Sequence, residues 1–311
     1  MTNSTKIDSK QANIYSIIIA YYSLSLIIIG TLLNLLTLFI LYRPKFRTNH
    51  ERPTIIYMRT VVITDILMLY GWNLDHYTQP IYHFDFFSYS IISCKLAWLL
   101  NYFSAQTSAW LRVLISFDRY MTLRRLHQTW FSRSKSAYIL IICVICFFIL
   151  FNLHLSIFGC YYDINGRIIT DSKLYKIAPT LDWINLVMYN CLPFILMVFF
   201  NSRIISHLLR IRRTSLLRNS RIHYRTVSIT SVITTFLFMI MTIPGTIGFG
   251  FFVDTVDLVI LMGLDAILFT YHILSFPLFL ITFDEFRQEF MKIISWKKNH
   301  RRILPHWIPF I

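Results

Sequence analysis

The chain has 311 residues, of which 56% are hydrophobic, 17% aromatic and 14% charged, and its mean hydropathy is +0.55. This composition excludes a soluble domain of ordinary make-up and indicates a protein that crosses a membrane several times. The net charge of +15 does not indicate nucleic acid as a partner, because the basic residues lie in short clusters between apolar runs and form no continuous basic face.

Seven apolar runs reach the ~20 residues that a membrane-spanning helix needs. We predict spans at Ile14–Tyr42, Thr54–Gln79, Ile91–Leu123, Ala137–Phe158, Thr180–Leu208, Thr226–Phe252 and Leu258–Thr282. In the stretch 283–296, apolar residues recur at spacings of three and four, which indicates an amphipathic helix along the membrane surface. The predicted fold is an all-α integral membrane protein, a seven-transmembrane helix bundle with a short amphipathic eighth helix.

Basic residues concentrate in the first, third and fifth connections and in the tail, whereas the other connections are richer in aspartate. By the positive-inside rule, the odd-numbered connections and the tail are cytoplasmic. In a plasma-membrane protein we therefore expect an extracellular N-terminus at 1–13, the spans within 14–282, and the amphipathic helix and cytoplasmic tail at 283–311. Asn3 begins an Asn-Ser-Thr sequon and then becomes a usable glycosylation site.

Two cysteines, Cys94 and Cys160, flank apolar runs on the outer side of the membrane. Both face an oxidising compartment, so a disulfide between them is chemically allowed and would tie the loop after the fourth span over the mouth of the bundle. Two unpaired thiols are the alternative.

A charged triplet, Asp118-Arg119-Tyr120, lies at the cytoplasmic end of the third run. A neighbouring acid and base can neutralise each other at the interface, which allows the arginine to face a cavity or a partner protein. The alternative is a pair of snorkelling interfacial charges, and the triplet alone favours that alternative.

A set of marker residues follows in order along the spans. It comprises Gly30 and Asn34 in the first span, Asp65 in the second, Cys94 and the triplet in the third, Cys160 after the fourth, Pro193 in the fifth, Phe238 and Pro244 in the sixth, Pro277 in the seventh, and Phe286, Arg287 and Phe290 in the amphipathic stretch. In this order, spacing and topology, the chain resembles a class A (rhodopsin-like) G-protein-coupled receptor over roughly residues 15–295.

The resemblance implies a receptor that binds an extracellular ligand and activates heterotrimeric G proteins, with membrane lipid around it. It implies a disulfide between Cys94 and Cys160, and a coupling switch formed by the Asp-Arg-Tyr triplet, in which Arg119 contacts the G protein and Asp118 holds it at rest. It also implies helix kinks at three prolines: Pro193, Pro244 and Pro277. The chain shows no phosphate loop or paired metal-ligand spacing, and the seventh span has no lysine for retinal, so we expect no enzyme, cofactor or metal.

Asp65 lies in the middle of the second span, where a carboxylate costs roughly 2.5–3.5 kcal/mol on insertion scales and needs polar partners. We expect an intramembrane polar cluster of Asn34, Asp65, Ser108 and His272, with Asp65 protonated or hydrogen-bonded. In the family this position helps to bind sodium with asparagines of the seventh helix. Because this chain has His272 and Phe276 there, no bound sodium is expected.

By resemblance, the ligand pocket lies between the outer halves of the third, fifth, sixth and seventh spans. Its expected lining is Asn101, Tyr102, Ala105, Asn185, Tyr189, Phe249, Asp265 and Thr270. Receptors for biogenic amines carry an aspartate where Asn101 lies, so an amine ligand is disfavoured. Four aspartates make the outer rim acidic, and they either attract a basic peptide or are ordinary solvated loop acids: Asp75, Asp254, Asp257 and Asp265.

Several switch residues of the family are replaced in this chain. In the seventh span, Phe276 and Leu280 stand where the asparagine and tyrosine of the proline motif are usual. Thr242 stands where the sixth-span tryptophan is usual, and Asn201 where a fifth-span tyrosine is usual. Tyr224 stands where some members keep an acid opposite the arginine, so an ionic lock between helices is not supported.

Two other interpretations stay open at this stage. A small transporter or channel would require internal repeats or a path of ionisable residues, and no repeat is found. A receptor-like protein that folds but does not signal would fit the replaced switch residues. Arg112, two turns before Arg119 on the third span, has no assigned partner in any of these interpretations.

Overall fold

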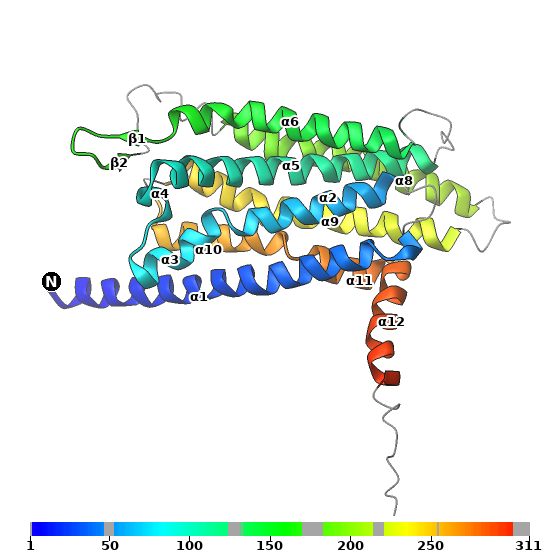
Figure 1. Cartoon of the computed structure of the whole chain (residues 1–311), viewed down its shortest axis with the longest axis horizontal. Helices are drawn as coiled ribbons and strands as arrows, with labels where there is room; N and C mark the ends of the chain where they lie inside the picture. Colours follow the sequence, from blue (N-terminus) through cyan, green and yellow to red (C-terminus); the bar gives the residue numbers. More distant parts are fainter. Residues whose placement is uncertain are drawn as a thin grey trace, which may run out of the picture.

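Helices that run side by side in a bundle make up most of the molecule (Figure 1). The structure, a computed structural model, describes residues 2–46, 53–123, 131, 133–169, 183–213, 221–253 and 255–300. Its longer helices are α1 (Thr2–Leu41), α2 (Pro53–Leu69), α3 (Trp72–Tyr82), α5 (Ile91–Leu123), α6 (Ser134–Phe158), α8 (Leu192–Arg213), α9 (Arg221–Phe251), α10 (Leu258–Tyr271), α11 (Ser275–Thr282) and α12 (Asp284–His300). Shorter elements are η1 (Pro44–Phe46), α4 (Phe86–Tyr89), the strands β1 (Tyr161–Tyr162) and β2 (Ile168–Ile169), and the π-helix η3 (Leu186–Cys191).

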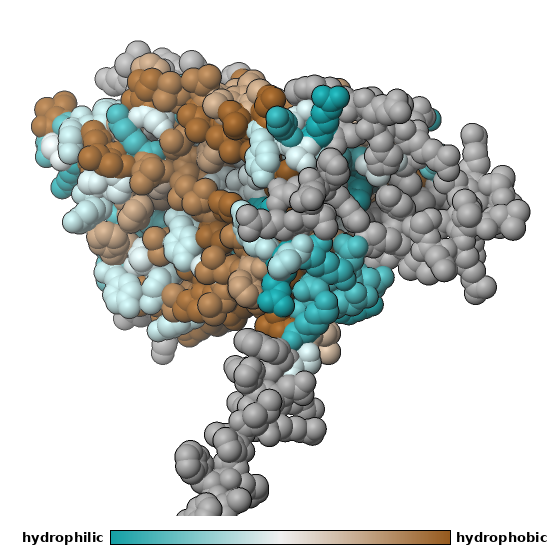
Figure 2. Space-filling view, turned by 45° about the vertical axis from the view of Figure 1, so that its right-hand side comes forward, coloured by the Kyte–Doolittle hydropathy of each residue, from teal (hydrophilic) through white to brown (hydrophobic). Residues whose placement is uncertain are grey.

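The outer surface of the bundle is hydrophobic. Figure 2 shows brown, hydrophobic residues over most of the described part of the visible side. Large apolar side chains on α1, α6 and α9 are exposed, among them Leu32, Leu150 and Ile240. Within the described residues, five helical stretches are long and apolar enough to cross a membrane, and the bent pair α10–α11 can form a sixth span. The chain is a multi-pass membrane protein.

Helix α5, the third predicted span, is not among those stretches. It is 33 residues long and carries Arg112, Asp118 and Arg119 in its second half. All three are buried, because α5 packs against α2, α6 and α8. Burial within a bundle is the arrangement that charged residues at membrane depth require. Cys94 marks one end of α5, here called the disulfide end, and Arg119 marks the other, here called the Arg119 end.

The second predicted span consists of two helices rather than one. Helix α2 ends at Leu69 and α3 begins at Trp72. Gly71 lies in this break, and a Cβ added there would come within 2.9 Å of Asn101 Oδ1 and 3.4 Å of Asn101 Cα. The close approach of this break to Asn101 of α5 therefore favours glycine at this position.

Two of the three predicted kink prolines lie next to irregular backbone. Pro193 follows the π-helix η3, where the backbone N–H of Leu192 donates to Val187 O. Pro277 is the third residue of α11, and α10 and α11 meet at a bend of 41°. Proline lacks an N–H and clashes with the carbonyl four residues earlier, which accounts for both irregular segments. Helix α9 runs through Pro244 as one helix.

Helix α12 turns away from the bundle at the Arg119 end (Figure 1). Phe286, in its first turn, is fully buried against Phe276 and Phe279. Further along, Glu289 accepts a hydrogen bond from Lys292 Nζ at 2.6 Å. The prediction of a short eighth helix is confirmed.

Candidate functional site

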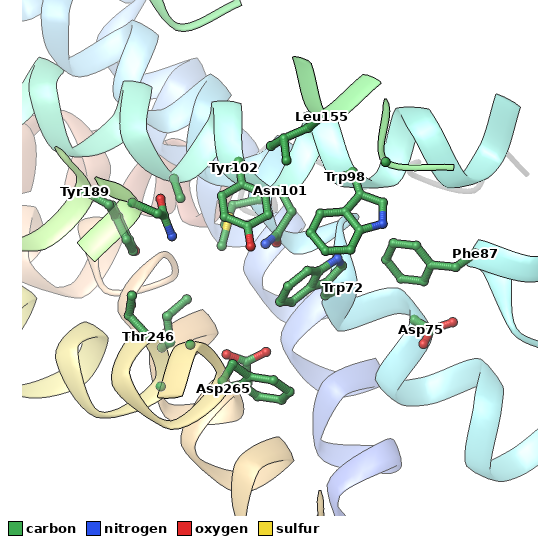
Figure 3. Close-up of a pocket in the computed structure, with 18 of the residues that line it drawn as sticks. Trp72, Asp75, Phe87, Trp98, Asn101, Tyr102, Leu155, Tyr189, Thr246 and Asp265 are labelled. Carbon is green, nitrogen blue, oxygen red and sulfur yellow. The ribbon is translucent and has the colours of Figure 1, made fainter. Parts of the chain in front are cut away.

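A cavity of about 800 Å³ lies at the disulfide end, walled mainly by α3, α5, α6, α9 and α10 (Figure 3). Most of the pocket residues expected from the sequence are in its wall: Asn101, Tyr102, Ala105, Asn185, Tyr189, Phe249 and Asp265. The volume is within the range of sites that enclose a drug-sized ligand.

Thr270, the remaining expected residue, lies elsewhere. Its hydroxyl oxygen is 2.6 Å from Tyr22 Oη of α1 and donates to Ala266 O at 2.7 Å. Thr270 comes five positions after Asp265 on the same helix, which turns it by ~140° at ~100° per residue. In this form of the protein the Thr270 side chain therefore contacts α1 and does not line the cavity.

A disulfide closes one side of the cavity. Cys94, in the first turn of α5, bonds to Cys160, which follows α6. Beyond Cys160 the chain forms the antiparallel hairpin of β1 and β2, in which Tyr162 pairs with Ile168. Gly166 makes the turn with a φ of 74°, a conformation that glycine adopts without strain. The predicted bridge therefore ties this hairpin to α5, and Ile168 reaches the cavity wall.

Trp72 is the centre of an aromatic cluster in the cavity wall. Its ring centroid is 5.4 Å from that of Trp98 and 5.8 Å from that of Tyr102, in both cases edge to face. Phe87 lies at 6.3 Å and Phe249 at 6.0 Å. These rings come from α3, α4, α5 and α9, so the cluster joins four helices and fixes the orientation of the ring faces.

Three aspartates lie in the cavity wall: Asp75, Asp85 and Asp265. Asp75 accepts a hydrogen bond from the backbone N–H of Phe86 at 3.0 Å. Asp85 caps α4 by accepting from the N–H of Phe87 at 2.8 Å. The side chain of Asp265 is only 7% exposed, so this residue lies inside the bundle and not on a solvated rim.

The expected acidic rim is therefore smaller than the sequence indicated. Asp257 is exposed and caps α10 by accepting from the N–H of Val259 at 3.0 Å, which is an ordinary capping role. Asp254 lies outside the described residues. No group of three or more His, Cys, Asp or Glu side chains in the described part of the chain is arranged to hold a metal ion.

Gln106 supports the wall of the cavity between three helices. Its Nε2 donates to Asn185 Oδ1 at 2.9 Å, and its Oε1 accepts from Asn152 Nδ2 at 2.7 Å. The expected pocket residue Asn185 is thus held through its side-chain oxygen by α5, which in turn is joined to α6.

Between the cavity and the Arg119 end, Asp65 is fully buried and hydrogen-bonded through both oxygens. Its Oδ1 accepts from Ser108 Oγ at 2.7 Å and lies 2.8 Å from His272 Nδ1. Its Oδ2 accepts from Arg112 Nη2 at 2.7 Å and from Ser275 Oγ at 3.2 Å. The structure therefore brings together three members of the expected polar cluster and adds Arg112 and Ser275.

Arg112 neutralises Asp65. Its side chain is 8% exposed, and its Cζ lies 4.8 Å from the ring centroid of Tyr271. The guanidinium of Arg112 compensates the charge of the Asp65 carboxylate. No uncompensated charge is then left at Asp65 to attract a sodium ion. Asn34 joins the cluster in a different way from that expected, because its Nδ2 donates to the backbone oxygen of His272 at 3.1 Å and not to Asp65.

The expected coupling residues follow at the Arg119 end of α5. Asp118 is 8% exposed and accepts a hydrogen bond from Thr54 of α2, and Arg119 is 7% exposed. The ring of Tyr120 lies 5.8 Å from that of Phe200 on α8. The first two side chains are therefore covered by neighbouring helices in this form of the protein.

Hydroxyl contacts close the same end. Ser116 of α5 and Ser231 of α9 lie 3.0 Å apart between their Oγ atoms, and Thr230 of α9 donates to Thr282 of α11. The side chain of Tyr224, the residue expected opposite the arginine, lies outside the described residues. Neutral hydroxyl contacts thus join α5 to α9 and α9 to α11 at this end.

Comparison with protein families matches residues 33–255, more than half of the chain, to the family described as 7 transmembrane receptor (rhodopsin family). The chain belongs to this family. A comparison with curated proteins finds no match. Because the family is one of receptors, the transporter or channel interpretation has no support from it.

In this receptor, two replaced family positions form hydrogen bonds between helices. Thr242, at the tryptophan position of the sixth helix, donates to Asn190 Oδ1 at 2.7 Å. Asn201, at the tyrosine position of the fifth helix, donates to Thr235 Oγ1 at 2.8 Å and accepts from Ser231 Oγ at 2.9 Å. Small polar contacts between η3 or α8 and α9 thus occupy positions where the family usually has aromatic rings.

Sequence reasoning missed part of the site, although signals for it exist. Trp72 and His76 line the cavity four residues apart on α3, so they share one face of that helix. Arg112 follows Ser108 by four residues, one helical turn, and Ser108 was already expected beside Asp65. The same spacing rule therefore indicated that Arg112 shares a helix face with Ser108, although it does not by itself bring Arg112 to Asp65 on another helix.

Proposed function

We propose that this receptor lies in the plasma membrane, binds an extracellular peptide in the cavity and activates a heterotrimeric G protein at the Arg119 end. The observation that carries the proposal is the course of α5. This one helix contributes Asn101 to the cavity, Arg112 to the buried ion pair, and Arg119 to the opposite end. The cavity, the buried ion pair and the proposed coupling residue are thus all connected by α5.

The orientation in the membrane is part of the proposal. Basic residues such as Arg43 and Lys45 lie in the connection after α1, and the tail after α12 is also basic. With these segments in the cytoplasm, residues 1–13 are extracellular and Asn3 can be glycosylated. Residues 14–282 then form the receptor domain, and 283–311 form an amphipathic helix on the lipid surface followed by a cytoplasmic tail.

Coupling requires a second form of the bundle, because Arg119 is covered in the form described. A ligand that binds an inner-open form more tightly shifts the population toward it. In that form α9 moves away from α5 and α11, which breaks the contacts Ser116–Ser231 and Thr230–Thr282 and opens Arg119 to the G protein.

A peptide-library screen read out by G-protein dissociation tests this function. We expect at least one peptide to trigger dissociation with the wild-type receptor and none to do so with Arg119→Ala at equal cell-surface level. Arg167→Ala, an exposed arginine of the hairpin at the disulfide end, is the matched control and should signal normally.

Background signal from the wild type under every peptide would contradict the proposal. With the receptor present at the cell surface, that result would favour a receptor-like protein that does not signal, an alternative consistent with Thr242, Asn201 and the altered seventh-helix motif. A response to biogenic amines alone would contradict the peptide assignment and leave the coupling assignment intact.

A further inference from the structure

The cavity wall is acidic in a strongly basic protein. Its described residues include three aspartates and neither lysine nor arginine, whereas the whole chain carries a net charge of +15. Asp75 and Asp85 each accept a hydrogen bond from a backbone N–H group. The described wall therefore contains no lysine or arginine to compensate the third aspartate, Asp265.

Asp265 is buried without a hydrogen-bond partner for its Oδ2 among the described residues. His76 Nε2 lies 3.7 Å from this oxygen, which is beyond hydrogen-bond distance. The imidazole stacks on Phe249 and meets the edge of Phe269, and a charged imidazolium between these rings would lose its hydration. A carboxylate in such surroundings is unfavourable until a cation pairs with it.

Aromatic rings and a second unpaired oxygen surround the same space. Figure 3 shows the carboxylate of Asp265 across the cavity from Asn101 and Tyr102, with the indole of Trp72 beside them. Asn101 is 8% exposed, and its Oδ1 also has no donor within the described structure. A ligand group that fits must supply positive charge, several N–H donors and a flat surface for the rings.

We propose that this cavity holds a guanidinium group of the ligand, the side chain of an arginine in a peptide, with its charge paired to Asp265 and its plane against the rings around Trp72. This inference rests on the proposed function, because it names the ligand chemistry of the same cavity. The carboxylate that pairs with the cation is then that of Asp265 on α10. Receptors for biogenic amines carry theirs on the third helix, at the position of Asn101.

A guanidinium fits better than the ammonium group of lysine or of a biogenic amine. It presents five N–H donors in one plane, stacks on aromatic faces and is more weakly hydrated, so it enters a cavity lined by rings at lower cost. An ammonium group can pair with Asp265, but it leaves fewer donors for Asn101 and gains less from the flat rings.

The test uses purified full-length receptor in lipid nanodiscs and two libraries of pentapeptide amides. The libraries are identical except that a fixed arginine in one is replaced by citrulline, its neutral isostere, in the other. We expect the arginine library to raise the melting temperature of the receptor and the citrulline library to leave it unchanged. An arginine peptide selected in this way should bind Asp265→Asn at least about 30-fold more weakly, because the variant removes one partner of a buried charge pair.

Asp257→Asn is the matched control. It removes the same charge from the same helix, at an exposed position where asparagine caps as well as aspartate, so the selected peptide should bind with unchanged affinity. Equal shifts from the two libraries, or no shift from either, would overturn the inference, and this comparison needs only the wild type. Undiminished binding to Asp265→Asn would also overturn it.

Direct binding separates this inference from the proposed function. Arginine-dependent binding without G-protein dissociation would contradict the coupling proposal and support the guanidinium site. Dissociation driven only by peptides without a cationic group would support coupling and contradict the guanidinium site.

Discussion

Two buried aspartates, Asp65 and Asp265, have opposite surroundings. Asp65 is fully buried, and donors reach both of its oxygens, including the guanidinium of Arg112 at 2.7 Å. Asp265 is 5% exposed, and its Oδ2 has no hydrogen-bond partner in the described part of the chain. Both lie in spans, where an uncompensated carboxylate is unfavourable. A buried aspartate that is neutralised, such as Asp65, joins helices. A buried aspartate without a cationic partner, such as Asp265, favours the binding of a cation.

Replacing Arg112 with methionine should have the largest effect, because it leaves Asp65 inside the bundle without the guanidinium that neutralises it. We expect a loss of about 3–5 kcal/mol of folding free energy, measured as a fall in the melting temperature of the purified receptor. Arg203→Met, on the exposed side of α8, is the matched control and should change it little. Adding Asp65→Asn to Arg112→Met should recover part of the loss, and a double variant no more stable than the single one would contradict the pairing.

Replacement of aspartate by asparagine should change the stability of the ligand-free receptor in opposite directions at the two sites. Asp65→Asn weakens the charged hydrogen bonds to Arg112 and should destabilise the ligand-free receptor by about 1.5–3 kcal/mol. Asp265→Asn removes the cost of burying a carboxyl group without a cationic partner and should stabilise the ligand-free receptor by about 1 kcal/mol. Parallel thermal melts measure both effects. A destabilised Asp265→Asn would mean that the carboxylate has a partner within the receptor, which would break the comparison.

Glu289 on α12 is an intermediate case with a smaller effect. Its side chain is 4% exposed, but those of Lys292 and Arg43 are 62% and 36% exposed. The hydrogen bond from Lys292 holds the pKa of Glu289 below its ordinary value of 4.5. Because the folded-state pKa is the lower one, the stabilisation is complete above the ordinary pKa and is lost as the pH falls through the folded-state value.

We therefore expect the stability advantage of wild type over Glu289→Gln to shrink on acidification, with a total effect below about 1 kcal/mol because the partners are solvated. Melting temperatures of both proteins, measured from about pH 7 down to about pH 3, test this. Asp257→Asn serves as the control for removing an exposed carboxylate. If the melting temperatures of wild type and Glu289→Gln fell in parallel with pH, the carboxylate of Glu289 would make no charge-dependent contribution to stability.

The smallest expected effect is that of sodium on the receptor. Arg112, Ser108 and Ser275 donate to the oxygens of Asp65, so a sodium ion would have to displace a guanidinium from its carboxylate. Exchange of sodium for choline at constant ionic strength should leave the melting temperature unchanged. Stabilisation specific to sodium would show that Asp65 is not fully compensated by Arg112.

The positions of the spans could be predicted because the free energy of placing a segment in lipid depends mainly on the residues of that segment. The break between α2 and α3 could not, because it depends on the approach of Gly71 to Asn101, which lies on another helix. The eighth helix was predictable from its own spacing. Its anchoring by Phe286 depends on the contacts with Phe276 and Phe279 from α11.

The cavity residues were predictable where the helical repeat of one span shows which of its residues share a face. Tyr102, Ala105 and Asp265 were expected in the pocket and line the cavity, whereas Thr270, also expected there, is turned by ~140° from Asp265 and contacts α1. The ion pair of Arg112 with Asp65 depends on α2 and α5 meeting at one depth, which no single run of sequence contains. The unpaired state of Asp265 could not be predicted either, since it depends on which side chains are absent from the surrounding helices.

The contacts made by Asn190 of η3 and Asn201 of α8 with α9 involve no charged groups. Amides and hydroxyls do not titrate near neutral pH and carry no net charge, so changes of acidity or ionic strength leave their hydrogen bonds unaltered. The seam between α2 and α5, in contrast, depends on a charge pair. Of these two interfaces, only the one between α2 and α5 therefore depends on the charge of its groups.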